Sequence, residues 1–346
     1  MKIIIFAGGV GTRLWPLSRE NSPKQFDKMF FGKSTLQLAI ERVAPAFGIS
    51  NIFIQTLEKY KPVVMEQIPE LPPENIIIEP DRRNLGPAVC LSMIKLNSLG
   101  YDGAVSLLWA DHLMDKVGEF VSALRAGNNL IEKKSNRFIF LAERPRFANN
   151  NLGWIKVGEE IGSSDGCNFY EFKGWKYKPS VEECDHMYRS GEFFWNPGYF
   201  ITSIKFLIET YQKLAPDIFR FVSSGHYSQA ESIHFDKAII EKVDLSDAIV
   251  IKTNMGWSDP GTLYALKEAL EETKHANVTS GLVSIMETSD CLIYNIEDKK
   301  LVATIGLKGM VIVNTTDALI VVPKDDVIKI TKLINQLKEE GRQKYL

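Results

Sequence analysis

The chain has 346 residues, of which 45% are hydrophobic and 24% are charged. This composition excludes a disordered or collagen-like chain, and the length suits about two domains with a large buried core. The 41 Lys and Arg residues nearly balance 43 Asp and Glu residues, for a net charge of -2. The charge therefore gives no argument for binding nucleic acid or an anionic membrane.

The four cysteines lie far apart and form no C-x-x-C pair. We therefore expect no zinc site and no disulfide framework, but reduced thiols as in a cytoplasmic protein. The first apolar run, residues 2–7, is too short for a signal peptide and is interpreted as a buried strand. No stretch approaches 18 apolar residues, so no membrane span is expected.

Up to about residue 145, short apolar runs alternate with longer amphipathic ones, which is typical of a parallel sheet covered by helices on both faces. Strands are expected at 2–7, 51–55, 75–79, 104–109 and 137–142, and helices at 34–47, 59–68, 86–99 and 117–133. Ser34 is expected to cap the first helix. Ligands of such α/β sheets bind beyond the carboxyl ends of the strands, so the loop after each strand is a candidate site.

The pattern changes towards the end of the chain. Residues 150–275 mix strands, helices and aromatic-rich loops and close with a helix at 261–273. Short strands then follow at 282–286, 291–296, 300–305, 310–313 and 318–322, before a helix at 324–340. Val327, Ile330, Ile334 and Leu337 share one face of that helix. We predict one domain of residues 1–276 and a small β-rich appendage of residues 277–346 with its closing helix.

The loop after the first strand contains Gly8, Gly9 and Gly11. Glycines let backbone N–H groups approach a phosphate closely. The loop has neither the Gly-Lys-Ser/Thr of a Walker A motif nor the third glycine of the dinucleotide fingerprint. Arg13 and Lys24 follow, and two such cations suit a polyphosphate better than a dinucleotide. Alone, the loop is equally consistent with a tight turn bearing surface charges.

Carboxylates end two later strands. Glu79 could accept hydrogen bonds from N1 and N2 of guanine, a pairing that adenine cannot offer; alternatively it is a strand-end residue, with Asn84 capping the next helix. Asp111 ends the fourth strand, where a carboxylate is well placed to hold Mg²⁺ against phosphates. An isolated Asp at that place is usually a turn or cap residue.

These segments together resemble the guanylyltransferases that act on mannose 1-phosphate, a branch of the sugar nucleotidyltransferase superfamily. The strings GG-x-GTRLWPLSR and PKQF carry the resemblance, as do EPDRRN from residue 79 and GWSDPG from residue 256. The resemblance spans nearly the whole chain. It implies an α/β fold: a Rossmann-like nucleotidyltransferase domain with a mostly parallel central sheet, followed by a short left-handed β-helix-like appendage that is used in dimer contacts.

The resemblance also implies a reaction and its participants. A phosphate oxygen of mannose 1-phosphate attacks the α-phosphorus of GTP in line, giving GDP-mannose and pyrophosphate with Mg²⁺ as cofactor. A homodimer is implied, and no nucleic acid or membrane partner.

Site residues carry over one by one. The implied nucleotide-binding residues are Ala7, Gly8, Gly9, Gly11, Thr12, Glu79, Asn84 and Ala88. Arg13 and Lys24 would neutralise the triphosphate, and Lys178 would hold the sugar phosphate. Asp111 and Asp259 would bind Mg²⁺, with His112 orienting its neighbours. The implied sugar-binding residues are Gly153, Tyr177 and Asn196. We expect the rings of Trp195, Tyr199 and Phe200 to pack in the core.

Tyr177 is the main departure from the family, which has Glu at this place in V-E-K-P. A phenol cannot hold a pair of sugar hydroxyls as a carboxylate can, and one such hydrogen bond to a charged group is worth roughly 1.5–3 kcal/mol. Glu171 is a candidate replacement. Two alternatives therefore stay open: a guanylyltransferase for another hexose or heptose 1-phosphate, and a non-catalytic sensor of nucleotide sugars.

Overall fold

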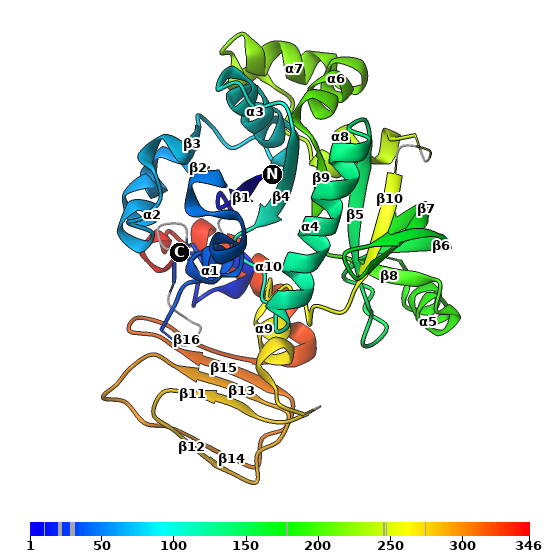
Figure 1. Ribbon diagram of the computed structural model, residues 1–346. Helices are drawn as coiled ribbons and strands as arrows, with labels where there is room; N and C mark the ends of the chain where they lie inside the picture. The colour runs from blue at the N-terminus through cyan, green and yellow to red at the C-terminus, as the bar shows by residue number, and fades with distance from the viewer. Residues whose placement is uncertain are drawn as a thin grey trace. The chain divides into compact units, whose positions relative to one another are not determined.

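The computed structural model describes residues 1–9, 11–19, 23–27, 32–177, 179–244, 246, 248–273 and 275–346. They form two compact units, each with its own hydrophobic core (Figure 1). Unit 1 comprises residues 1–8, 39–110 and 114–257. Unit 2 comprises residues 9–38, 111–113 and 258–346.

Unit 1 is built on a ten-stranded sheet in the order β10-β7-β6-β8-β5-β9-β4-β1-β2-β3. The strands are β1 (Lys2–Phe6), β2 (Ile52–Leu57), β3 (Ile76–Glu79), β4 (Ala104–Trp109), β5 (Phe138–Glu143), β6 (Gly153–Ser164), β7 (Cys167–Tyr177), β8 (Phe193–Asn196), β9 (Phe200–Ser203) and β10 (Ala248–Thr253). The pairings give β7, β8 and β9 the direction opposite to that of the other seven strands. The α/β fold with a mostly parallel central sheet is confirmed.

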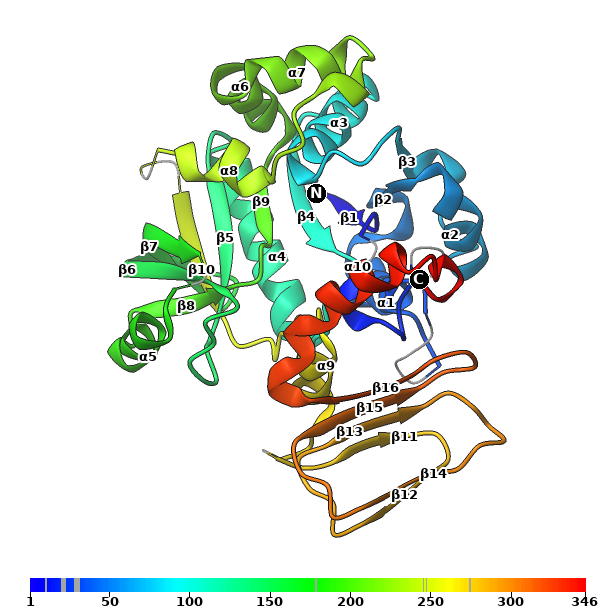
Figure 2. The same ribbon diagram turned by 180° about the vertical axis from the view of Figure 1, so that it is seen from behind.

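Helices cover both faces of this sheet. On one face lies α4 (Val117–Lys133), whose Phe120 ring packs 5.3 Å from that of Tyr199; it stands in front of β9 and β5 in Figure 1 and behind them in Figure 2. The other face carries α3 (Leu85–Ser98), α6 (Ile204–Leu214), α7 (Pro216–Ser223) and α8 (Phe235–Ala238), which share a core with Ile4 and Phe6 of β1. The neighbouring β1 residues Ile3 and Ile5 are also fully buried, so both faces of the strand are covered, as its continuous apolar run predicts.

The remaining α-helices are α1 (Thr35–Phe47), α2 (Lys61–Gln67), α5 (Val181–Ser190), α9 (Leu263–Leu270) and α10 (Ile330–Glu339). Ser34 caps α1 as predicted, because its Oγ accepts the backbone N–H of Gln37 at 3.2 Å. None of the described helices is long and apolar enough to cross a membrane. All four cysteines are free thiols.

The end of unit 2 is a flattened coil of short strands (Figure 1). One sheet has the order β11 (Val278–Ser280), β13 (Leu292–Asn295), β15 (Met310–Asn314) and β16 (Leu319–Pro323), and the other pairs β12 (Val283–Met286) with β14 (Val302–Ile305). All pairings are parallel except β15 with β16. Successive turns are joined by side chains, since Asn314 donates to Oδ1 of Asn295 at 2.8 Å.

The five strands predicted here are present, whereas β11 was not predicted because its three residues include a single apolar one. A short 3₁₀ segment (Lys324–Lys329) precedes α10, and Val327, Ile330 and Ile334 are buried as the helical pattern predicts. The helix predicted at 261–273 is shorter, ending at Leu270.

Candidate functional site

The glycine loop of unit 2 is closed around Ser18 and Lys24. Gly11 has φ of 67°, and a Cβ there would lie 2.8 Å from Cγ of Lys24 and 2.9 Å from Oγ of Ser18. Only glycine fits on both counts. The buried Oγ of Ser18 accepts the backbone N–H of Lys24 at 3.0 Å, and Nε2 of Gln25 donates to the carbonyl of Gly9 at 2.8 Å.

Lys24 brings the two predicted metal-binding carboxylates together. Its Nζ lies 2.7 Å from Oδ2 of Asp111 and 3.7 Å from Oδ1 of Asp259. The chain segments that carry the two aspartates meet in an antiparallel bridge between Leu113 and Ser258. The structure thus joins residues from distant parts of the sequence around one cation.

The charges of this cluster shift each other's protonation. Burial alone would lower the pKa of Lys24, but the carboxylates of Asp111 and Asp259 outweigh it and raise that pKa. Burial would raise the pKa of Asp111, yet the ammonium of Lys24 and the ring of His112 hold it well below its usual range. Both groups are therefore charged at neutral pH.

Arg13 is exposed and lies near this cluster on a 3₁₀ turn (Thr12–Leu14). Its positive charge reduces the pKa rise of Lys24, so the two predicted phosphate-binding cations act on the same region. The side chain of Thr12 and the whole of Lys178, both predicted site residues, lie outside what the structure describes.

The donor set suits a divalent cation in chemistry but is small. Across the described residues, no three His, Cys, Asp or Glu side chains group together as metal ligands. Asp111 and Asp259 offer two carboxylates, and the positive charge near them in this structure is the ammonium of Lys24. Carboxylate pairs of this kind hold Mg²⁺ when substrate phosphates and water complete its shell.

In unit 1, Glu79 ends β3 beside the start of the glycine loop. A Cβ on Gly8 would lie 3.5 Å from Oε2 of Glu79, so this oxygen is within van der Waals reach of the first glycine of the loop. The other oxygen, Oε1, accepts the hydroxyl of buried Tyr227 at 2.7 Å. Burial raises the pKa of Glu79, and the hydrogen bond from Tyr227 opposes the rise.

The next segment, at the start of α3, contacts residues 232 and 233. Asn84 adopts φ of 59° at the N-cap position, but its side chain caps no helical N–H; instead its Nδ2 donates to Oγ of Ser232 at 2.9 Å. A Cβ on Gly86 would lie 2.7 Å from the carbonyl oxygen of Ile233, so any larger residue there would clash with that backbone. Ala88 is buried in the adjoining core.

The three predicted sugar-binding residues lie on neighbouring strands. Gly153 of β6 pairs with Asn196 of β8 and with Tyr177 of β7. A Cβ on Gly153 would lie 3.5 Å from Cβ of Asn196 and 3.9 Å from Cδ2 of Tyr177. A single pair between Glu143 and Trp195 places this cluster at the carboxyl end of β5. The side chain of Tyr177 is exposed.

Glu171 does not replace the missing family carboxylate. It lies several residues before Tyr177 on β7, about 20 Å along an extended strand, and Oε2 forms an exposed ion pair with Lys173 at 2.8 Å.

The prediction that the rings of Trp195, Tyr199 and Phe200 pack in the core is confirmed, because each of these residues is 1% exposed.

Glu143 is a residue that sequence reasoning missed. This fully buried carboxylate ends β5 and accepts the backbone N–H groups of Met255, Gly256 and Trp257 at 2.8, 2.9 and 3.2 Å. It thereby fixes the turn that leads to Asp259. Its signal, an acidic residue directly after an apolar strand, is the same as that of Asp111.

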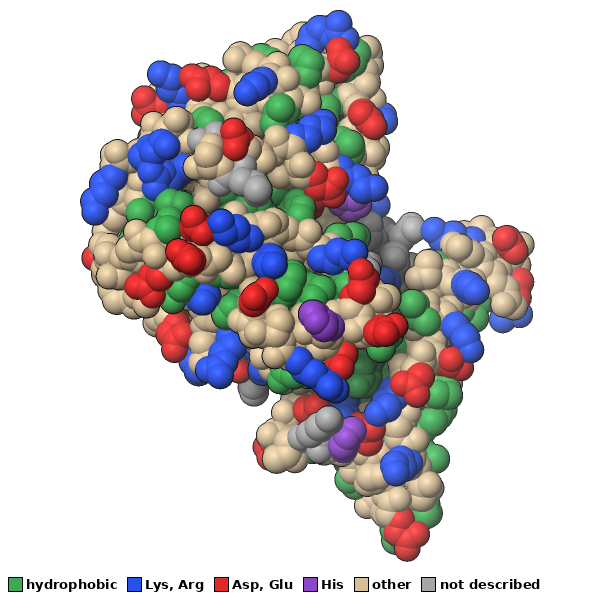
Figure 3. All heavy atoms as spheres, turned by 90° about the vertical axis from the view of Figure 1, so that its right-hand side faces the viewer, with side chains coloured by type: hydrophobic (Ala, Val, Ile, Leu, Met, Phe, Trp, Pro, Cys, Tyr) green, Lys and Arg blue, Asp and Glu red, His purple; other side chains and the backbone are tan. Residues whose placement is uncertain are grey.

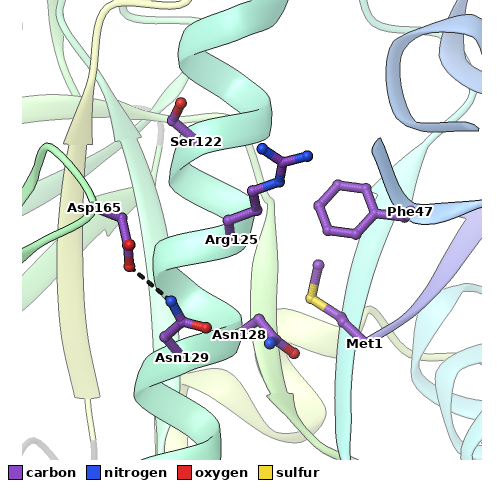
Figure 4. A pocket seen from close by; sticks show the side chains of 7 residues that line it. All are labelled: Met1, Phe47, Ser122, Arg125, Asn128, Asn129 and Asp165. Atoms are coloured by element: carbon purple, nitrogen blue, oxygen red, sulfur yellow. Dashed lines mark hydrogen bonds between the residues drawn. The ribbon is translucent and has the colours of Figure 1, made fainter. Parts of the chain in front are cut away.

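A separate cavity of about 400 Å³ lies in unit 1. Figure 4 shows it beside Met1, which precedes β1, and beside Phe47, Arg125 and Asn128, with Asn129 donating to Asp165. None of the predicted site residues lines it.

On the face shown in Figure 3, Lys and Arg side chains are mixed with Asp and Glu side chains, in keeping with the balanced composition.

Comparisons with known proteins agree with this arrangement. A family model described as nucleotidyl transferase matches residues 2–276, and one described as a MannoseP isomerase/GMP-like beta-helix domain matches residues 281–337. A mannose-1-phosphate guanylyltransferase of Escherichia coli is 30% identical over 99% of this chain and 76% of its own length. One of Klebsiella pneumoniae is 31% identical over 99% and 75%.

Among solved structures, one named mannose-1-phosphate geranyltransferase, from Thermus thermophilus, superposes with a TM-score of 0.87 at 26% identity. The match covers 97% of this chain and 99% of that one. The family model and the relatives match nearly the whole chain, including the glycine loop and the paired aspartates. The chain therefore belongs to the nucleotidyl transferase family, in the group of the mannose-1-phosphate guanylyltransferases.

Proposed function

We propose that the chain transfers the guanylyl group of GTP to mannose 1-phosphate, forming GDP-mannose and pyrophosphate. The observation that carries the proposal is the Lys24 ammonium close to both Asp111 and Asp259, with the stem of Lys24 packed against Gly11 of the glycine loop. Two polyanions must meet in this reaction, so catalysis consists mainly of charge neutralisation and alignment.

Each set of residues handles one part of the substrates. Backbone N–H groups of the loop and the cations Arg13 and Lys24 bind the triphosphate and screen the departing pyrophosphate. Lys178 holds the phosphate of the sugar. With these groups in place, an oxygen of the sugar phosphate attacks the α-phosphorus in line, and no covalent enzyme intermediate is needed.

Asp111 and Asp259 would hold Mg²⁺, which when bound neutralises phosphate charge. Glu79 would accept hydrogen bonds from N1 and N2 of guanine through its carboxylate, with Oε1 already fixed by Tyr227. Asn196 and Tyr177 would contact sugar hydroxyls, with Gly153 providing the flat surface beside them.

We further propose that residues 1–276 form the catalytic domain and that residues 277–346 serve contacts in a homodimer. Sedimentation equilibrium tests the second point, since a chain that remains monomeric at assay concentrations would refute it.

One alternative substrate is favoured by a specific observation. Tyr177, 71% exposed, stands beside Gly153 and Asn196 where a carboxylate is expected. Another hexose or heptose 1-phosphate would then be the acceptor, with the same chemistry at the phosphates.

The deciding experiment measures pyrophosphate release with Mg²⁺, GTP, ATP or UTP, and a panel of sugar 1-phosphates. Fast release with GTP and mannose 1-phosphate alone would support the main proposal. Release with GTP and another sugar would support the alternative. Tight binding of nucleotide sugar without any turnover would instead indicate a non-catalytic sensor.

A further inference from the structure

Arg19, at the end of the WPLSR string, is bound on two sides within unit 2. Its Nη2 lies 2.5 Å from Oδ1 of Asp317 and its Nη1 lies 3.0 Å from Oδ2, a two-pronged ion pair. Such paired contacts fix direction as well as distance. The guanidinium is 17% exposed and the carboxylate 41%, so the pair is partly shielded from water.

The acceptor belongs to a well-defined turn. Asp317 lies between β15 and β16, where the N–H of Thr315 donates to the carbonyl of Ala318 at 2.8 Å and the N–H of Ala318 donates to Oγ1 of Thr315 at 3.1 Å. The β15–β16 pairing continues on either side of the turn. Arg19 is therefore attached to a rigid part of the coil.

A second attachment uses the carbonyl oxygen of Tyr345. It accepts Nη1 of Arg19 at 2.9 Å and Nε1 of Trp15 at 2.6 Å. Trp15 is buried in the same core as Val313 and Ile330. The segment between Trp15 and Arg19 is thus held at both ends.

This segment is hydrogen-bonded to Lys24. Ser18, which precedes Arg19, is fully buried and accepts the backbone N–H of Lys24 at 3.0 Å. Because a Cβ on Gly11 would collide with both Ser18 and Lys24, Gly11, Ser18 and the stem of Lys24 are closely packed against one another. A shift of residues 18 and 19 must then displace the stem of Lys24, whose ammonium lies 2.7 Å from Asp111.

We propose that Arg19 is a positioning residue: by binding Asp317 and the carbonyl of Tyr345, it fixes the Lys24 ammonium where the nucleotide triphosphate is bound. The inference rests on the phosphate-binding role of Lys24 in the proposed function. It gives the β15–β16 turn a part in nucleotide use through its ion pair with Arg19.

The test compares Arg19→Gln and Asp317→Asn with the unaltered chain, using whichever nucleotide and sugar 1-phosphate turn over fastest. Each variant should raise the KM for the nucleotide about tenfold, because small displacements of a binding group have effects of that order or larger. The KM for the sugar phosphate should stay unchanged. Arg220→Gln is the matched control, since it breaks an exposed ion pair with Asp217 at 2.7 Å that has no link to the loop.

Two further variants separate positioning from mere stability. The double variant Arg19→Gln/Asp317→Asn should be no worse than the poorer single one, because the two residues act through one contact. Arg19→Lys keeps the charge but not the paired geometry and should fall between the unaltered chain and Arg19→Gln. If Arg19→Gln does not fold, Asp317→Asn alone decides, since Arg19 keeps its bond to Tyr345.

An unchanged nucleotide KM in Asp317→Asn, or equal rises in both KM values, would overturn the inference. If GTP is not a substrate, the proposed base specificity is refuted. The comparison of the Arg19 and Asp317 variants with the unaltered chain still stands, because it uses whichever nucleotide turns over fastest. If the chain shows no turnover, nucleotide dissociation constants from calorimetry replace KM, and a chain that binds no nucleotide refutes both proposals.

Discussion

The ammonium of Lys24 is the counter-ion of Asp111, at 2.7 Å, and it also faces Asp259 at 3.7 Å. The protein thus supplies a positive charge of its own to the carboxylate pair that we propose binds Mg²⁺. Since Lys24 is buried and its pKa is raised by these carboxylates, it keeps this charge through the neutral pH range. A metal ion bound there would therefore compete with Lys24 for the same two side chains.

Replacing Lys24 by Met should tighten the binding of Mn²⁺ to the nucleotide-free protein about tenfold. Removing a unit charge a few ångströms from the metal relieves repulsion on the order of 1–4 kcal/mol. Electron paramagnetic resonance of free Mn²⁺ measures this directly and needs no turnover. Unchanged or weaker Mn²⁺ binding would show that Lys24 does not occupy the metal's place.

Asp111→Asn and Asp259→Asn should each lower kcat about a hundredfold or more, because charge stabilisation by a bound metal is worth several kcal/mol. Circular dichroism should be unchanged in both. Asp185→Asn, which removes an exposed ion pair with Arg189 at 2.9 Å, is the control. Full activity in either variant of the pair would remove that residue from the proposed site.

Glu79→Gln should reduce the preference for GTP over ATP, measured as a ratio of kcat/KM, by about tenfold or more. An amide offers one acceptor oxygen where guanine presents two donors, so a donor is left unpaired. Tyr227→Phe removes only the bond to Oε1 and should give a smaller loss in the same ratio. A preference that does not change in Glu79→Gln would mean that the base is read elsewhere.

Asn196→Ala should raise the KM for the sugar 1-phosphate severalfold, in line with about 1 kcal/mol for a lost hydrogen bond, and leave the KM for GTP unchanged. Tyr177→Glu restores the family's carboxylate beside it and should increase kcat/KM for mannose 1-phosphate. If Tyr177→Glu instead lowers this value and another sugar works better in the natural chain, the alternative acceptor is favoured.

Asp290 should make unit 2 sensitive to acid. It is buried, with Oδ1 2.5 Å from Nζ of Lys267 and Oδ2 in contact with Lys324. Burial opposes ionisation, but the hydrogen bonds from both lysines lower the pKa of Asp290 to about 2. A lowered pKa stabilises the fold above the usual carboxyl pKa of about 4, and the contribution is lost as pH falls from there to about 2.

The size of that contribution is about 2 kcal/mol. Asp290→Asn should therefore lower the free energy of unfolding at pH 7 and flatten its dependence on pH below about 4. Chemical denaturation at several pH values measures both. Asp298→Asn, at an exposed turn position, is the control, and an Asp290→Asn profile parallel to that of the natural chain would contradict the prediction.

Much of the fold follows from burial patterns that the sequence displays directly. Strands such as Ala104–Trp109 are continuous apolar runs because both faces are covered, and the apolar run predicts the bounds of this strand correctly. The unpredicted β11 is too short to show any alternation. Helix α9 ends at Leu270 although helix-forming residues continue to Thr273, so the sequence pattern overestimates its length.

The site was predictable where one residue sits at the end of one strand, and not where it depends on a partner far along the chain. Asp111 and Glu79 are visible as strand-end acids, but nothing in the spacing links Asp111 to Asp259; the resemblance to a family supplied that link. Tyr227 and Asp317 carry no local signal, because their roles arise only from packing against Glu79 and Arg19.

In the four-stranded sheet of unit 2, β11 is an edge strand of three residues, and its neighbour is β13. A sheet edge offers unpaired backbone groups to any other extended chain, and a short edge strand limits how many can be recruited. Lengthening β11 by a few β-branched residues would leave the glycine loop untouched and yet create a longer template for pairing with another chain. The brevity of β11 thus limits edge-to-edge pairing on this side of the four-stranded sheet.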